Sequence, residues 1–395
     1  MNRILFIAPL PPPVHGSAMV SKYIKDSAKV QSVAQCDWVN LSTSRRMDEI
    51  GKGGAMKLLR FMGAYLKTLW LLLTHRYDLC YLAITCHGIG FLKDAPFVWL
   101  CKMFGCRVLI HQHNKGMSNC IDRWPYRWLI PYIYKRARVM LLSWHLYPDI
   151  AKVVKREQVV ICPNGIAAEQ QVNCDDSQVN VALPRLNAAE QRVNCDESQV
   201  SAAINRSEAA SLPVNLLFLS NLIPSKGVYV LLDACRILRD KGLDFQCNFV
   251  GGETKEIDRA RFEAELQRRG LEGMVRYEGP KYGEEKEEYW RSSDVFVQPT
   301  YYFNECFPLV ILEAMQHGLP VVSTTEGAVP DMVADGVNGF VCERKDVSGL
   351  AVALERLITD ASLRRRMGEE GYRIYKDKFT LEKFEERFAE CLRRG

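Results

Sequence analysis

Residues 300–318 read TYYFNECFPLVILEAMQHG and follow a short apolar run, Val295–Gln298. The apolar run is typical of a buried strand. Pro308 suits the first position of the helix that follows, because proline lacks the amide hydrogen that would be unpaired there. Glu305 is therefore expected in the loop before the helix, and Glu313 about one and a half turns into it. A strand, a loop and a helix in this order predict a parallel sheet with a ligand-binding loop at the end of its strand.

The same alternation of strands and helices extends over both halves of the chain. Before residue 164, strands are expected at 4–8, 79–84, 107–111, 139–142 and 159–161, with helices at 17–31, 55–74, 90–104 and 124–136. Later strands are expected at 214–220, 245–250, 275–278, 295–298, 321–323 and 339–342. Strands separated by helices form parallel βαβ units. We therefore predict an α/β fold of two tandem Rossmann-like domains, residues 1–165 and 213–378. A C-terminal helix is expected at 379–395, and its packing on the first domain is left open.

Residues 166–212, between the two domains, contain a duplication. Residues 167–187 read AAEQQVNCDDSQVNVALPRLN and residues 188–208 read AAEQRVNCDESQVSAAINRSE, a period of 21 residues. Two copies are too few to build a repeat domain, and the segment is polar and acidic. We interpret it as a flexible linker or surface insertion.

The formal net charge of +5 is unevenly distributed over the 395 residues. Residues 1–165 hold 23 Lys/Arg against 9 Asp/Glu, a net of +14, whereas residues 213–395 hold 26 against 31, a net of −5. The basic half predicts an anionic partner, such as an anionic membrane surface or a lipid-diphosphate acceptor. Nucleic acid is not expected, because no stacking motif or recognised nucleic-acid-binding fold accompanies the charge.

The most apolar expected helix covers residues 55–74. It contains Lys57, Arg60 and Lys67, so we do not expect it to span a membrane. Its apolar residues recur at helical spacing, which predicts a surface helix. We favour packing on a core and keep a position at a membrane interface as the alternative.

The chain has 14 scattered cysteines without a Cys-x-x-Cys pair, and its first apolar run is too short for a signal peptide. These features predict free thiols and a cytoplasmic protein.

Two segments predict a phosphate site at strand ends. Residues 9–16, PLPPPVHG, end in Gly16, which lets the backbone approach a ligand at a helix N-terminus. Residues 220–227, SNLIPSKG, contain Lys226, whose ammonium can neutralise a phosphate.

A third segment, residues 109–116, reads LIHQHNKG and brings His111, His113 and Lys115 to the end of a strand. Alternation puts both histidines on one face, so one of them is interpreted as a core histidine. Together with Cys120 they match no zinc-binding spacing. We therefore predict no metal site and no cofactor.

These motifs together resemble those of the retaining glycosyltransferases of family 4 (glycosyl transferases group 1), which have the GT-B fold. The most specific element is the E-x7-E pattern from Glu305 to Glu313. GAVPDMV at 327–333 and NGF at 338–340 continue it, and PNGI at 163–166 matches at the domain junction. The resemblance covers almost the whole chain except the duplicated linker. It implies two Rossmann-like domains that face each other across a cleft.

The resemblance also implies roles for individual residues. Lys226 would hold the donor diphosphate, Glu313 the nucleotide ribose and Glu305 the hydroxyls of the sugar. The other implied donor-binding positions are Gly16, Asn221, Phe307, Pro308 and Leu309.

His113 resembles the family's histidine beside the sugar, and with Glu305 it is the catalytic candidate. Two positions depart from the family pattern. Asn221 stands where arginine is common, so one phosphate cation is missing or comes from elsewhere. His15 precedes Gly16 where the family has two glycines.

The implied reaction transfers a sugar from a nucleotide diphosphate sugar to a hydroxyl of a glycan or lipid-linked acceptor, with retention and without a metal. It would serve surface polysaccharide or glycolipid assembly of the bacterial type, in the cytoplasm or at the inner face of the membrane. A nucleotide-sugar epimerase on the same fold and a non-catalytic nucleotide-sugar binding protein stay open as alternatives.

Overall fold

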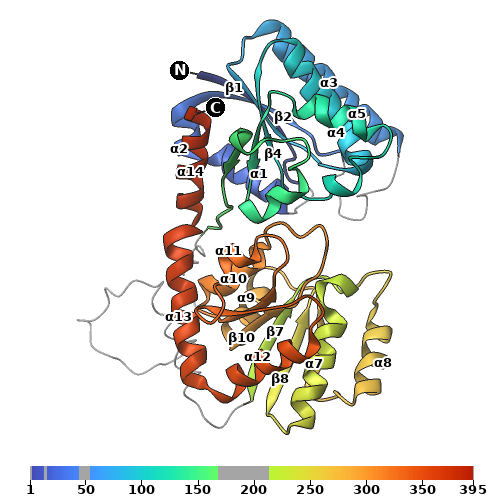
Figure 1. Cartoon of the computed structure of the whole chain (residues 1–395), viewed down its shortest axis with the longest axis vertical. Coiled ribbons are helices and arrows are strands. Elements are labelled where there is room, and N and C mark those ends of the chain that lie inside the picture. Colours follow the sequence, from blue (N-terminus) through green and yellow to red (C-terminus); the bar gives the residue numbers. More distant parts are fainter. Residues whose placement is uncertain (1, 13–15, 44–53, 168–212, 395) are drawn as a thin grey trace, which may run out of the picture.

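The computed structural model describes residues 2–12, 16–43, 54–167 and 213–394, which form two α/β domains and two C-terminal helices (Figure 1). The two domains lie one above the other along the long axis of the molecule. The predicted linker at 166–212 lies outside the described residues from residue 168 onward, and so does His15.

The N-terminal domain is built on a parallel six-stranded sheet with the order β2-β1-β3-β4-β5-β6. Its strands are β1 (Asn2–Ala8), β2 (Ala34–Asn40), β3 (Leu79–Ala83), β4 (Arg107–His111), β5 (Arg138–Leu141) and β6 (Val159–Ile161). The sequence did not predict β2, which buries only Ala34 and Val39. An edge strand with five half-buried or exposed residues shows no apolar run.

Helices cover both faces of this sheet. They are α1 (Gly16–Asp26), α2 (Ala28–Val33), α3 (Ala55–Thr74), α4 (Gly88–Met103) and α5 (Tyr126–Tyr134). The helix expected at 17–31 is divided at Ser27, whose side chain accepts a hydrogen bond from the Val30 amide and begins α2. Along β1, Leu5 and Ile7 face the cluster that includes α3, α4 and α5, and Phe6 faces α1, α2 and the C-terminal helix.

The C-terminal domain repeats this plan with the strand order β12-β11-β10-β7-β8-β9, again wholly parallel. The strands are β7 (Val214–Leu219), β8 (Phe245–Val250), β9 (Val275–Gly279), β10 (Val295–Gln298), β11 (Val321–Thr324) and β12 (Gly339–Cys342). The helices are α7 (Val228–Asp240), α8 (Arg259–Arg269), α9 (Glu284–Ser292), α10 (Leu309–Gln316), α11 (Val329–Met332) and α12 (Val347–Thr359). The predicted α/β fold with two Rossmann-like domains is confirmed.

Two helices at the end of the chain connect the domains: α13 (Ala361–Lys378) and α14 (Leu381–Arg394). Helix α13 packs on α10, and α14 packs on α2 of the N-terminal domain (Figure 1). Between them the chain meets the domain junction, where Ile166 donates to the Phe379 carbonyl at 3.0 Å and accepts from the Leu381 amide at 2.7 Å. Phe388 of α14 is fully buried against the N-terminal sheet.

Helix α3 buries only Thr68, Leu71 and Leu72 fully. The favoured interpretation of residues 55–74 as a core-packed helix therefore holds for one side of the helix only. Within the described part of the chain, no helix is both long and apolar enough to cross a bilayer.

Candidate functional site

A cavity of about 710 Å³ opens between the two domains. Helix α1 and the domain junction line one side, and the strand ends and helices α9 and α10 line the other. Eight of the nine predicted site residues line it: Gly16, Asn221, Lys226, Glu305, Phe307, Pro308, Leu309 and Glu313. The ninth, His113, does not.

At the centre of the C-terminal side, Lys226 and Glu305 form an ion pair. Their side chains are only 15% and 11% exposed, and the Lys226 ammonium lies 4.8 Å from the centre of the Tyr302 ring. Gly227, next to Lys226, has a φ of 94° and lies so close to the Pro299 carbonyl that any Cβ would collide. Only glycine lets the lysine loop approach the end of β10 this closely. The pair places a cation and a carboxylate together where two strands end.

A second ion pair lies further along α10. The Glu313 carboxylate is 2.7 Å from the Lys286 ammonium, which comes from α9. Tyr23 of α1 lines the cavity from the other domain, where burial and then the negative charge of Glu313 raise the pKa of its hydroxyl. Groups from both domains therefore meet at Glu313.

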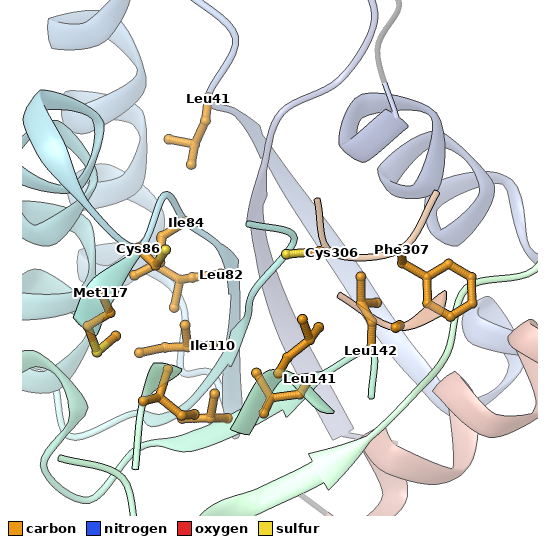
Figure 2. Packing of buried hydrophobic residues seen from close by; sticks show 14 of the residues in the cluster. Leu41, Leu82, Ile84, Cys86, Ile110, Met117, Leu141, Leu142, Cys306 and Phe307 are labelled. Carbon is orange, nitrogen blue, oxygen red and sulfur yellow. The ribbon is translucent and has the colours of Figure 1, made fainter. Parts of the chain in front are cut away.

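The segment between the two glutamates joins the domains. Cys306 and Phe307 are 4% and 7% exposed and belong to the same apolar cluster as Leu142, which follows β5 (Figure 2). Pro308 is the N-cap of α10, and Leu309 is its first helical residue. A Cβ atom added to Gly16 would lie 4.0 Å from the Leu309 side chain. The loop that carries Glu305 is thus packed against the N-terminal domain.

Asn221 lines the cavity, but its side chain makes a hydrogen bond to the backbone of a neighbouring loop. Its Oδ1 accepts a hydrogen bond from the Gly252 amide at 3.1 Å, which joins the loops after β7 and β8. Asparagine supplies no positive charge in place of the family's arginine. Among the described residues that line the cavity, the cations are Lys226 and Lys286.

The two histidines of β4 and its following loop lie together. Their ring centres are 3.9 Å apart. His111 is the core histidine, and its Nδ1 shares a 2.6 Å hydrogen bond with the Tyr81 hydroxyl. Burial, and then the neighbouring His113, lower the pKa of His111 well below its usual range. His111 is therefore neutral at physiological pH, and His113 lies on the N-terminal side outside the cavity lining.

A largely buried ion pair crosses the interface, in addition to the exposed contact of His145 with Asp331 at 3.3 Å. Lys115, two residues after His113, pairs with Glu326, which follows β11 and is 1% exposed. Arg344 lies 3.3 Å from the same carboxylate. The adjacent Gly327 has a φ of 59°, and a Cβ there would lie 2.5 Å from the Glu305 carbonyl oxygen. The His113 loop is thereby connected to the loop of Glu305.

Sequence reasoning missed Lys286 and Glu326. Lys286 stands in the run EEKEEY, where a lysine among glutamates is typical of a solvated helix face. Glu326 meets Lys115 over a separation of 211 residues, which no local pattern encodes. The one local signal near it is that Glu326 directly precedes the family-like motif GAVPDMV at 327–333.

Residues 203–374 match the family model described as glycosyl transferases group 1. Among curated proteins, the amylovoran biosynthesis glycosyltransferase AmsK of Erwinia amylovora is 32% identical over 149 residues, 37% of this chain and 36% of that protein. A D-inositol 3-phosphate glycosyltransferase of Corynebacterium jeikeium is 37% identical over 158 residues, 38% of this chain and 37% of that protein. The matched region spans little more than a third of the length of these relatives.

Solved structures of the same fold cover the whole chain. Anabaena HepE in complex with UDP superposes with a TM-score of 0.68, at 18% identity and over 100% of both chains. Sucrose-phosphate synthase from Thermosynechococcus elongatus gives 0.69, at 17% identity, over 100% of this chain and 99% of that one. Together these likenesses establish that the chain has the GT-B fold, and the similarity to glycosyl transferases group 1 extends over residues 203–374.

Proposed function

We propose that the protein is a glycosyltransferase that moves a sugar from a nucleotide diphosphate sugar to a hydroxyl group, with retention of the anomeric configuration and without a metal ion. The observation that carries the proposal is the pair of Lys226 and Glu305 in the interdomain cavity, with Glu313 on the following helix. A cavity of about 710 Å³ has the size of a small-molecule site.

In the proposed complex, the donor diphosphate takes the place of the Glu305 carboxylate as the partner of Lys226. The free amides at the start of α10 add hydrogen-bond donors and a positive dipole end. These fixed groups stabilise the negative charge that develops on the departing diphosphate. Glu305, released from Lys226, accepts hydrogen bonds from the sugar hydroxyls, and Glu313 accepts them from the ribose.

Retention and the catalytic groups form the finer part of the proposal. Attack from the face that the diphosphate leaves would preserve the configuration, with the leaving phosphate as the base. Glu305 would support positive charge on the sugar ring. His113, the other catalytic candidate, would lie beside the sugar, because Lys115 and Glu326 connect its loop to the loop of Glu305.

The proposed acceptor is a glycan or a lipid-linked hydroxyl that binds to the N-terminal domain. AmsK, whose name assigns it to amylovoran biosynthesis, supports a role in surface polysaccharide assembly. A cytoplasmic location at an anionic membrane surface belongs to the same proposal, since the net charge of residues 1–165 is +14.

The test is nucleotide-dependent stabilisation, followed by transfer. Thermal unfolding is measured with UDP, GDP and ADP on the wild type, on Glu313→Ala and on Glu272→Ala, a control at an exposed glutamate outside the cavity lining. We expect one nucleotide to stabilise the wild type and the control but not Glu313→Ala, because ligand binding shifts the unfolding equilibrium. Stabilisation that Glu313→Ala retains in full would contradict the site.

Transfer is then measured with sugars of the base so identified. Retention predicts that the product keeps the anomeric configuration of the donor, as read by NMR, and the metal-free mechanism predicts full activity in EDTA. A product with the inverted configuration would contradict retention. Loss of activity in EDTA that added Mg²⁺ restores would contradict the metal-free mechanism. Nucleotide binding without transfer to any acceptor would favour the non-catalytic alternative.

A further inference from the structure

Helix α3 has an apolar side that no described residue covers. Five large side chains share this outward face, at exposures from 42% to 66%: Leu59, Met62, Leu66, Trp70 and Leu73. They recur every three or four residues, so they form one stripe along the helix. Thr68, Leu71 and Leu72 lie on the opposite side and are buried in the domain. Helix α3 is therefore apolar on two opposite sides, of which the core uses one.

The neighbouring helices extend the apolar surface. Helices α3, α4 and α5 lie together on the N-terminal domain, away from α7 and α8 of the other domain (Figure 1). Trp99 and Met103 on α4 are 42% and 62% exposed, and Trp124 and Trp128 around α5 are 78% and 70% exposed. Exposed apolar residues scattered singly are ordinary, but a contiguous group of this kind marks an interaction surface.

The exposed charges on the three helices have one sign, and the exposed Asp122, two residues before Trp124, pairs with Lys152 at 2.7 Å. Helices α3 and α5 contain no acidic residue, and the only one in α4, Asp94, is 3% exposed and pairs with Lys93. Arg60 and Lys67 flank the outward face of α3, where each donates one hydrogen bond to a backbone carbonyl, of Thr43 and Trp38 respectively, and keeps further N–H donors. Arg127 stands beside Trp128. Apolar and aromatic side chains bordered by basic ones are suited to an anionic interface. A second copy of the chain would bring the same basic groups against them.

We propose that the outward face of α3, with the exposed aromatic residues of α4 and α5, docks the N-terminal domain on an anionic lipid bilayer. The helix lies along the bilayer surface, with its stripe among the upper acyl chains and its basic groups among the lipid phosphates. The inference rests on the proposed function for its purpose, since a lipid-linked acceptor is presented at such a surface. The binding itself needs neither donor nor acceptor.

The experiment is sedimentation of the full chain with vesicles of phosphatidylcholine alone or mixed with phosphatidylglycerol. We expect binding to the anionic vesicles only, weakened as salt approaches about 0.5 M. Leu66→Gln combined with Trp70→Gln should reduce the bound fraction at least about tenfold, because the apolar stripe supplies the insertion. The control Val352→Gln replaces an apolar residue that is 52% exposed on α12 and should bind as the wild type does.

Other outcomes would overturn the inference. Equal binding of the wild type and the double variant would show that the stripe is not inserted. A dimer that the double variant dissociates, without vesicle binding, would assign the face to a second copy. Nucleotide stabilisation, measured on the same samples, separates the two proposals: its loss with intact vesicle binding contradicts the proposed function alone, and the reverse contradicts docking alone.

Discussion

The two domains have the same scaffold, but their surfaces differ in net charge and in the distribution of exposed apolar residues. Each is a parallel six-stranded sheet covered by helices on both faces. The large exposed apolar residues described for the C-terminal domain are scattered, at Tyr282, Phe303, Val337 and Val352, whereas most of those described for the N-terminal domain lie on or next to α3, α4 and α5. The net charges of −5 for residues 213–395 and +14 for residues 1–165 follow the same division. The comparison teaches that the fold determines where a binding site forms. The side chains at the strand ends and on the helix faces determine what that site can bind.

The two domains also contribute different groups to the cavity between them. The C-terminal domain supplies both ion pairs, Lys226 with Glu305 and Lys286 with Glu313. The N-terminal domain supplies small and apolar contacts such as Gly16, together with Tyr23. One domain therefore provides the charged groups of the cavity, which in the proposed function bind the donor, and the other closes the cavity.

The largest effect on the comparison of the two domains is expected at α14, the C-terminal helix that packs on the N-terminal domain. Phe388→Ala removes a fully buried ring from the N-terminal core, which should lower the free energy of unfolding of that domain by about 3–5 kcal/mol. Tryptophan fluorescence in urea reads this domain, since six of the seven tryptophans lie in residues 1–165. Arg393→Ala, exposed on the same helix, is the control. An unchanged fluorescence transition would show that α14 does not stabilise the N-terminal domain.

The variant Glu305→Gln tests whether a charged group of the C-terminal domain takes part in the proposed reaction. The change keeps the shape of the side chain and removes its charge, so kcat should fall by about 10²–10³-fold, or about 2.7–4 kcal/mol. Nucleotide binding should persist, because Lys226 loses its carboxylate partner and stays available for phosphate. Glu343→Gln, at an exposed glutamate outside the cavity lining, controls for the loss of a negative charge. An unchanged kcat would remove Glu305 from the mechanism.

The sequence predicted which residues of the C-terminal domain come together at the cavity, because the signals for them are local. The E-x7-E spacing places Glu305 and Glu313 on one loop and helix, and Gly227 follows the phosphate lysine within the same turn. Each relation spans a few residues, so helix geometry and glycine conformation fix it without the rest of the fold.

The features that escaped prediction depend on contacts between distant segments. Lys115 meets Glu326 only when the two domains close, and β2 becomes a strand because β1 offers it an edge. The exposed side of α3 escaped for another reason. Hydrophobic periodicity shows which residues share a side of a helix, but it cannot tell which of two apolar sides the core covers.

The interface between the domains can be tested at Lys115 and Glu326, the largely buried ion pair that crosses it. Lys115→Met leaves the buried Glu326 carboxylate with Arg344, whose side chain is 50% exposed. A double-mutant cycle with Glu326→Gln should give a coupling energy of about 0.5–3 kcal/mol in urea unfolding. The single variants should also raise the KM for the donor, since the pair holds the Glu326 loop against Glu305. Additive effects would mean that the pair does not couple the domains.

The smallest effect, a dependence on pH, should belong to the N-terminal domain. The pKa of buried His111 lies well below its usual range, so the folded chain keeps this ring neutral where the unfolded chain, with a pKa of about 6.5, takes up a proton. Its contribution to stability is therefore complete above about pH 6.5 and is lost as the pH falls, by up to about 1.4 kcal/mol per pH unit.

His111→Gln offers Tyr81 a hydrogen-bond partner without a titrating group, so its free energy of unfolding should fall less steeply between about pH 6.5 and 5. Tyr81→Phe removes the hydroxyl but keeps the buried imidazole, and it should therefore keep the slope of the wild type. The measurement is urea unfolding followed by tryptophan fluorescence at each pH. If His111→Gln retained the full slope, the acid sensitivity would come from groups other than His111.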